Sequence, residues 1–264
     1  MKKAGTILPP VLTVLGLALA VQALSDLGIL QGFVLPAPGA VLAALWQGRA
    51  ELAPHAASTF LLSLLGFLLS LLVALVLAVA MDRLPIFHRA VYPLVVGSQT
   101  IPILVLAPVI ILLFGFGFLP RLVVVVLVCF FPVCISLSEA FRAFDPDWHR
   151  LLRSMGARPL AVLFHGKLPA ALPAFFAGTR VSATYCVMAA VLAEWMGADR
   201  GLGAYMMRVR RSYAYDRMFA AILLIVVESL LFFALSAWIQ RVSLPWKEKG
   251  VLTDAPSASE PSSS

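Results

Sequence analysis

The side chains that could do chemistry are concentrated in one basic stretch of the chain, residues 139–173. It holds arginines, a tryptophan and two glycines, and apolar runs lie on both sides of it. A cationic segment of this length has no place inside a lipid bilayer, where each charge is costly. We therefore interpret it as an exposed surface, through which a separate component drives this protein.

The motifs that would make the chain an enzyme are absent from the sequence. There is no G-x-x-x-x-G-K-[ST] loop to hold ATP phosphates, no G-x-S-x-G nucleophile turn and no H-E-x-x-H zinc pair. The histidines lack ligand spacing and the cysteines lie in apolar runs without a C-x-x-C pair: His55, His88, His149, His165; Cys129, Cys134, Cys186. We predict no catalytic residue, no metal and no cofactor on this chain.

The composition is that of a membrane protein. Of the 264 residues, 61% are hydrophobic and 12% are charged, about half the ~25% charged share of soluble domains. Only helices or closed barrels satisfy their backbone in lipid. Runs such as 61–80 are apolar on every face, which excludes the alternation of barrel strands. The net charge of +7 then indicates cationic cytoplasmic loops rather than nucleic-acid binding.

We expect an all-α membrane protein with about six transmembrane helices, since the apolar runs have the length that a bilayer requires. The runs are 8–25, 57–80, 92–114, 119–138, 174–193 and 218–240. Basic residues favour the cytoplasmic side, and their distribution predicts that both termini and the 139–173 stretch are cytoplasmic. The arginines from Arg200 to Arg217 oppose this rule. Whether they meet lipid headgroups, an acidic protein or an anionic substrate stays open.

The two ends of the chain are less regular. Lys2 and Lys3 precede an apolar stretch, as in a signal peptide, but its length favours a retained helix and the alternative stays open. Residues 251–264 are rich in Ser and Pro, which predicts a disordered tail. We therefore expect one transmembrane domain over 1–250, followed by that tail.

Local signals predict two short helices inside the basic stretch. Asp145 can cap the first helix, and Gly156 can end it in a left-handed conformation. The apolar residues of this helix recur at three- and four-residue spacing: Trp148, Leu151, Leu152 and Met155. A second helix is expected over about 159–165, with Pro169 and Pro173 redirecting the chain into the next span. Such a pair fits a groove on another protein, and the alternative is an amphipathic turn lying on acidic lipid.

The spacing Gly156-x9-Gly166-x-Leu168-Pro169 resembles the EAA-x3-G-x9-I-x-LP motif of permease subunits of binding-protein-dependent ABC importers. It departs from that motif where Arg150-Leu151-Leu152 replaces Glu-Ala-Ala and where Gly166 replaces Ile. Further stretches resemble the nitrate, sulfonate, taurine and hydroxymethylpyrimidine branch of the same family: 101–108, 114–117, 130–132, 193–195 and 201–203. The resemblance covers about residues 57–245.

This resemblance implies a type I ABC importer permease in the bacterial inner membrane, forming a homodimeric pore. A cytoplasmic ATPase, which binds the ATP, would dock on residues 145–166, and an extracytoplasmic binding protein would deliver the substrate. Gly156 would form the turn between the coupling helices. The other expected coupling residues are Trp148 and Leu152 as apolar anchors, Arg150, Arg153 and Arg158 as cationic contacts, and Gly166, Leu168 and Pro169 from the motif.

The translocation pathway is predicted from polar residues in apolar surroundings. Ser98, Gln99 and Thr100 lie in a proline-rich span, which suggests either a pore-facing segment or a kinked packing helix. Glu228 is an intramembrane carboxylate that needs a partner such as Arg180, or a proton. Glu194 lies where the fifth span ends, before a turn that faces the binding protein in the resembled family.

The leading prediction is therefore an importer permease, and the alternative is a stand-alone secondary transporter or channel. The second class calls for a clear internal repeat or charged pair at mid-membrane, and neither is evident in the sequence. The substrate is a small polar molecule. The stretches 130–132 and 193–198 favour a thiamine-precursor pyrimidine over a sulfonate or nitrate-like anion.

Overall fold

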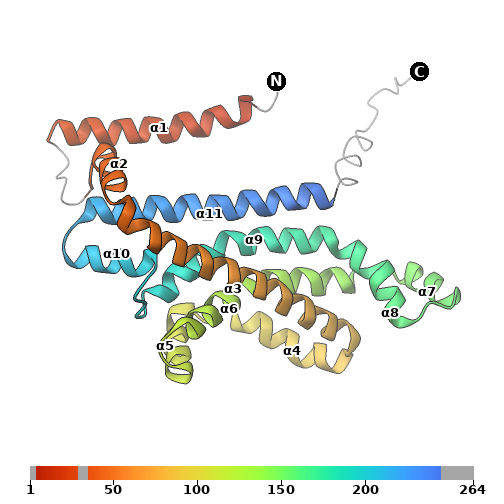
Figure 1. Ribbon diagram of the computed structural model, residues 1–264. Coiled ribbons are helices and arrows are strands. Elements are labelled where there is room, and N and C mark those ends of the chain that lie inside the picture. Colours follow the sequence, from red (N-terminus) through yellow and green to blue (C-terminus); the bar gives the residue numbers. More distant parts are fainter. Residues whose placement is uncertain (1–3, 29–34, 245–264) are drawn as a thin grey trace, which may run out of the picture. The chain divides into compact units, whose positions relative to one another are not determined.

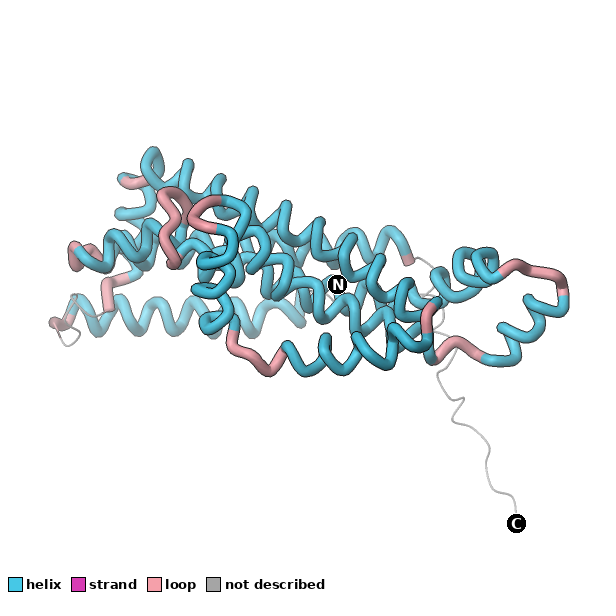
Figure 2. The backbone as a smooth tube through the Cα atoms, turned by 90° about the horizontal axis from the view of Figure 1, so that it is seen from below, coloured by secondary structure: helices cyan, strands magenta, loops and turns pink. Residues whose placement is uncertain are grey.

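The protein is described by a computed structural model that covers residues 4–28 and 35–244. Every regular element in these residues is helical, and the helices are joined by short loops (Figure 2). The predicted tail at 251–264 lies outside the described residues, as do Lys2 and Lys3. The all-α fold class therefore agrees with the prediction for the part of the chain that the structure describes.

The chain forms two compact units, each built from three separate segments. The first comprises residues 1–70, 101–129 and 185–230, and the second comprises 71–100, 130–184 and 231–264. Four long helices contribute to both units: α3 (Arg49–Arg83), α6 (Phe118–Arg142), α9 (Leu168–Glu194) and α11 (Tyr215–Ser243). The two units are described separately below.

The first unit adds α1 (Ala4–Asp26), α2 (Pro38–Gln47), α5 (Ile103–Phe114) and α10 (Leu202–Arg211) to the parts of the long helices that it contains. Its main core gathers around α10 and consists of Ala44, Leu52, Leu202, Tyr205, Val209, Ala220 and Ala221. Gly66 on α3 lies directly against Val125 on α6, where a larger residue would overlap the valine side chain. Close packing of helices through small residues is typical of membrane proteins.

The second unit contains α4 (Pro85–Ser98), α7 (Pro146–Ser154), α8 (Pro159–Val162) and the π-helix η1 (Leu163–Lys167), with the start of α9 following directly (Figure 1). Gly178 on α9 packs against the backbone of α6, because a Cβ atom there would lie 2.7 Å from the carbonyl oxygen of Pro132. The buried side chains of this unit include Leu137, Phe141 and Val162.

Four helical segments are long and apolar enough to cross a membrane: Arg49–Arg83, Phe118–Arg142, Pro159–Glu194 and Tyr215–Ser243. A fifth span results if α4 and α5 are counted as one broken span, interrupted by residues 99–102. The first apolar run enters this count only as a shorter helix, Leu15–Asp26. The number of six spans therefore stays a prediction.

Two details of the expected chain path are wrong. The expected second helix over about 159–165 is not a separate element, because α8 passes through the π-helix η1 into α9 as one helical segment, Pro159–Glu194. Pro169 and Pro173 do not redirect the chain, since α9 runs through both. Pro169 lies just after η1, and the helix continues through it although proline has no N–H to donate.

Candidate functional site

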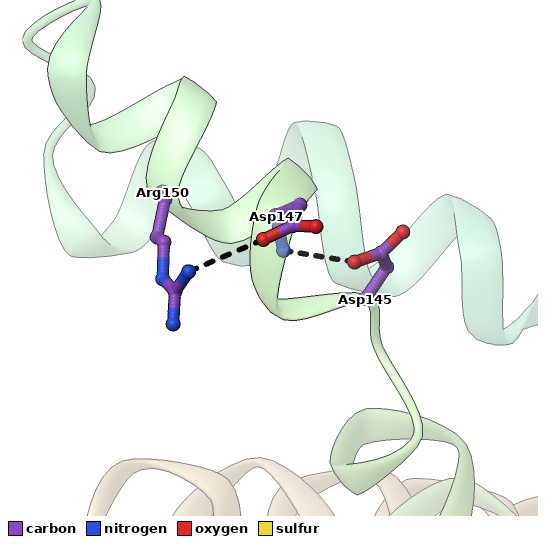
Figure 3. Close-up of polar contacts among 3 residues, drawn as sticks. All are labelled: Asp145, Asp147 and Arg150. Atoms are coloured by element: carbon purple, nitrogen blue, oxygen red, sulfur yellow. Dashed lines mark hydrogen bonds and ion pairs between the residues drawn. The ribbon is translucent and has the colours of Figure 1, made fainter.

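The first candidate site is the helix pair α7–α8, which begins with a well-formed cap (Figure 3). The Asp145 carboxylate accepts a hydrogen bond from the backbone N–H of Asp147 at 2.8 Å, and Pro146 occupies the first turn. Asp147 also pairs with Arg150 at 3.3 Å, but both side chains are at least 80% exposed, so this pair adds little stability. The cap and the helix start predicted from the sequence are both present.

The end of α7 is fixed by Gly156, which has φ = +83°. The N–H of Gly156 donates to the Arg153 carbonyl and the N–H of Ala157 donates to the Leu152 carbonyl, both at 3.0 Å. These bonds satisfy carbonyls that the helix leaves free. A Cβ atom on Gly156 would meet nothing within 4 Å. Glycine is therefore favoured here by the backbone conformation and not by lack of space.

The surface of α7 carries large apolar side chains beside arginines. Trp148 is 59% exposed, Leu151 49% and Met155 76%. Arg150, Arg153 and Arg158 are exposed around them. Leu152 is half-buried instead, and with Trp148, Phe144 and Gly166 it lines a cavity of about 570 Å³. Exposed aromatic and apolar side chains flanked by arginines are typical of protein-binding surfaces.

Gly166 lies in η1, closely packed against its neighbours. A Cβ atom there would be 3.0 Å from Leu152 Cδ1 and 3.2 Å from Phe144 Cζ. The space that an isoleucine would take at this position of the resembled motif is therefore filled by Phe144 and Leu152. Leu168 and Pro169 follow in the first turn of α9.

Two polar contacts attach the helix pair to the last turn of α3. Lys167 Nζ lies 2.5 Å from Asp82 Oδ1, with side chains only 19% and 9% exposed. Arg83 donates to the Pro159 carbonyl at 2.8 Å. Sequence reasoning placed Arg83 and Lys167 in cytoplasmic segments but missed both contacts. No local pattern links residues that stand 85 and 76 positions apart.

The second candidate site is a buried turn in the first unit, where Glu194 ends α9. Glu194 is 1% exposed. Its carboxylate accepts hydrogen bonds from Thr59 Oγ1 at 2.9 Å and from the Gly203 N–H at 2.9 Å. Thr59 Oγ1 in turn accepts from the Leu202 N–H at 2.7 Å, and His55 Nδ1 accepts from the Gly201 N–H at 3.0 Å. Side chains from α3 and α9 thus cap the free N–H groups that begin α10.

The two glycines of this turn make room for Glu194. Gly201 has φ = +130°, and a Cβ atom on it would overlap the Glu194 carboxyl group. A Cβ atom on Gly203 would lie 2.5 Å from the Val191 carbonyl oxygen. The stretches 193–195 and 201–203, noticed separately in the sequence, therefore form one packed structure.

Tyr205 closes the inner side of the turn. Its ring lies 5.3 Å from the His55 ring, centroid to centroid. Its hydroxyl is buried without a hydrogen-bond partner among the described residues. Burial raises the pKa of Tyr205, because the phenolate would lose its hydration. Tyr205 therefore acts as an apolar core residue of the turn.

The other predicted pathway residues lie in α4, in the break after it and in α11. Ser98 ends α4, and Ser98 and Thr100 donate to the Val95 and Gly97 carbonyls of their own segment at 2.9 and 2.7 Å. Gln99 is exposed in the break after α4. Glu228 is buried in α11, and its Oε2 has no hydrogen-bond partner in the described part of the chain. The pairing of Glu228 with Arg180 stays a prediction.

Helices that are long and apolar enough to cross a membrane define an integral membrane protein. Residues 66–245 match the family described as binding-protein-dependent transport system inner membrane component, and the chain belongs to this family. It is a permease subunit of an ABC importer and not an enzyme, as the missing motifs predicted. Permeases of this family work with an ABC ATPase and a substrate-binding protein.

Individual relatives support this assignment. The formylaminopyrimidine transport permease protein ThiX of Halalkalibacterium halodurans is 30% identical over 250 residues, covering 94% of this chain and 100% of the relative. The taurine transport system permease protein TauC of Escherichia coli is 28% identical, covering 77% of this chain and 72% of the relative. The solved MetNI methionine ABC transporter, in inward-facing conformations, shares the fold, with a TM-score of 0.57, 20% identity and coverage of 76% and 95%. The type I importer permease architecture follows from these similarities.

Proposed function

We propose that the α7–α8 pair is the coupling segment of this permease and that the ATPase which binds ATP grips it on the cytoplasmic side. The observation that carries the proposal is the exposure of Trp148, Leu151 and Met155 on a doubly capped helix. Leaving these groups in water is unfavourable, and a groove on a partner would bury them. Arg150, Arg153 and Arg158 would meet acidic groups around that groove.

The attachments to α3 give the segment a way to move the membrane helices. When the ATPase pair closes on ATP, each coupling segment would shift as a rigid lever. The Lys167–Asp82 pair and the Arg83–Pro159 hydrogen bond would pass this shift to the last turn of α3. The spans of a homodimer would then exchange inward-open and outward-open packings, a two-state change biased by ligands.

The pathway assignments form the next part of the proposal. Ser98, Gln99 and Thr100 would line the pore at the break after α4, because an interrupted helix is tolerated in a membrane only where it is buried in protein or borders water. Glu228 would face the same aqueous route, which solvates its unpaired oxygen. The turn held by Glu194 would face the binding protein on the outer side. The membrane domain comprises residues 1–250 in this proposal, with both termini in the cytoplasm of a bacterium.

For the substrate, we propose a small polar pyrimidine of the thiamine-precursor type. The support is the similarity to ThiX along nearly the whole chain, together with the stretches 130–132 and 193–198. A sulfonate is the second candidate, supported by the likeness to TauC. Uptake of labelled formylaminopyrimidine and taurine, measured in proteoliposomes with the partner proteins encoded beside this permease, would decide between them.

Co-purification tests the coupling proposal directly. The wild-type chain, co-expressed with its ATPase, should retain the ATPase through affinity purification. A variant with Trp148→Ala and Met155→Ala should lose it while inserting normally, because the buried apolar contact is gone. Leu112→Ala is the matched control, since Leu112 is 86% exposed and lies on α5, outside the α7–α8 pair. Equal retention by the double variant and the wild type would refute the assignment of α7 as the docking helix.

A further inference from the structure

A cavity of about 500 Å³ lies in the second unit, between the end of α3, the start of α4 and the end of α6. Its wall is mixed. Met81 and Pro93 contribute apolar surface, and the polar groups are Asp82, His88, Arg89, Tyr92, Ser138 and Arg142. The coupling proposal does not use this cavity, which is separate from the one beneath Trp148.

Two guanidinium groups of the cavity have no partner within the described residues. Arg89 and Arg142 are exposed, and neither makes a hydrogen bond or ion pair there through its side chain. The acid in the wall, Asp82, is already occupied by Lys167. Glu139, just outside the wall, accepts from the Tyr92 hydroxyl at 3.3 Å. The two guanidinium groups that face the cavity therefore form no ion pair within the described residues, and the Glu139 carboxylate lies one helical turn from Arg142 on α6.

A nitrogen of His88 beside this cavity, Nε2, is also buried without a hydrogen-bond partner among the described residues. The His88 ring stacks on Tyr92, with centroids 4.9 Å apart. Buried polar groups normally have such partners. An anionic oxygen in the cavity would accept from His88 Nε2 and from the two guanidinium groups together.

The surroundings of the cavity indicate what carries that anion. On α4, Ile86 is 85% exposed and Leu94 is 70% exposed, so the helix that lines the cavity also carries exposed apolar side chains. Arg142 ends α6 only a few residues before the coupling segment, and the proposed orientation would place it near the headgroups of the cytoplasmic leaflet. Basic pockets between transmembrane helices on this side are typical binding sites for anionic lipid headgroups.

We infer that this cavity binds the phosphate group of an anionic phospholipid of the inner leaflet, with Arg89, Arg142 and His88 as ligands and the acyl chains along Ile86 and Leu94. The choice of leaflet rests on the proposed orientation of the coupling segment. A second copy of the chain is a poorer occupant, because a twofold contact through this surface would bring like arginines together.

The experiment measures lipid binding by the purified full-length chain in detergent. Native mass spectrometry should show phosphatidylglycerol retained more strongly than phosphatidylcholine, and phosphatidylglycerol should raise the melting midpoint more. In the double variant Arg89→Gln, Arg142→Gln the affinity for phosphatidylglycerol should fall by roughly fivefold for each arginine removed. The double variant Arg89→Lys, Arg142→Lys should keep part of the affinity for phosphatidylglycerol, since lysine retains the charge of arginine but not its bidentate geometry.

The matched control is Arg241→Gln, which removes a cation from the last turn of α11 without touching the cavity wall. It should bind phosphatidylglycerol as the wild type does. If the double glutamine variant does not fold, the single variants Arg89→Gln and Arg142→Gln answer the same question, because both side chains are exposed.

Two results would overturn the inference. If the glutamine variants of Arg89 and Arg142 bind phosphatidylglycerol as the wild type does, the cavity is not the lipid-binding site. A wild-type chain that is stabilised as much by inorganic phosphate as by the lipid would identify a site for a soluble anion instead. The lipid measurement contains no ATPase, so a negative result in it would not affect the coupling proposal. In the same way, a failure of the permease to retain the ATPase would not affect the lipid site.

Discussion

At the residue scale, the turn after α7 shows how a single backbone angle limits which residue types can occupy a position. With φ = +83° and open space around it, Gly156 is a position where conformation alone selects the side chain. Asparagine tolerates the left-handed region, whereas proline is fixed near φ = −65°. The two substitutions therefore separate the geometry of the turn from the identity of its residue.

We predict that Gly156→Pro abolishes ATP-coupled uptake, because α7 can no longer end in the turn that joins it to α8. Gly156→Asn should retain most of the uptake, with a strain of about 1 kcal/mol. Uptake in proteoliposomes and insertion, checked by membrane fractionation, are the measurements. Normal uptake by the proline variant would show that the turn plays no part in coupling.

At the element scale, α10 depends on other helices for its beginning. Gly201 lacks a side chain to cap the helix, so Thr59, His55 and Glu194 satisfy the free N–H groups. Removing the Thr59 hydroxyl would leave the buried Leu202 N–H without an acceptor and take one donor from the Glu194 carboxylate. Such losses are costly because the groups cannot turn to water.

We predict that Thr59→Val lowers the free energy of unfolding by about 1–3 kcal/mol. Thr179→Val is the matched control. It removes the hydroxyl of another buried threonine, which bonds only to the Phe175 carbonyl of its own helix, and it should have a smaller effect. Melting midpoints of the two purified variants check this prediction. If both variants lower the melting midpoint by the same amount, the hydrogen bonds that cap α10 contribute no more to stability than a hydroxyl bonded within its own helix.

The link between η1 and α3 belongs to the same scale. Asp82→Asn should weaken the attachment by about 2 kcal/mol, since a charge-assisted hydrogen bond becomes a neutral one. ATP hydrolysis by the assembled transporter should then continue while uptake falls. The charge-swapped double variant Asp82→Lys, Lys167→Asp should recover part of the uptake that each single swap loses. Single swaps that transport normally would contradict the role of this pair.

At the scale of the whole molecule, the orientation in the membrane decides which partner meets which surface. Replacing Cys129, Cys134 and Cys186, all buried, by alanine gives a background for labelling. In it, Ser212→Cys, after α10, should react with a membrane-impermeant thiol reagent added to intact cells. Ser154→Cys, on α7, should react only in inverted vesicles. Labelling of Ser154→Cys from outside would place the coupling segment on the wrong face of the membrane.

The sequence predicted what depends on neighbouring residues and missed what depends on distant ones. The cap at Asp145 and the turn at Gly156 follow from local chemistry, and both are present. The contacts of Asp82 with Lys167 and of Thr59 with Glu194 join residues that no periodicity connects. The π-helix η1 also escaped prediction, because a change of hydrogen-bond register has no marker in the local sequence.

The shared cap of α10 limits how this permease can be redesigned. The turn from Glu194 to Gly203, with α10 after it, is an attractive segment to exchange with that of a relative that carries another cargo. Its acceptors, however, are distributed between α3 and α9, and the glycines are shaped around the Glu194 carboxyl group. A chimera that takes only residues 194–211 from the relative would receive a helix start whose N–H groups are fitted to the acceptor side chains of that relative. His55 and Thr59 of the recipient would therefore have to be exchanged together with the graft.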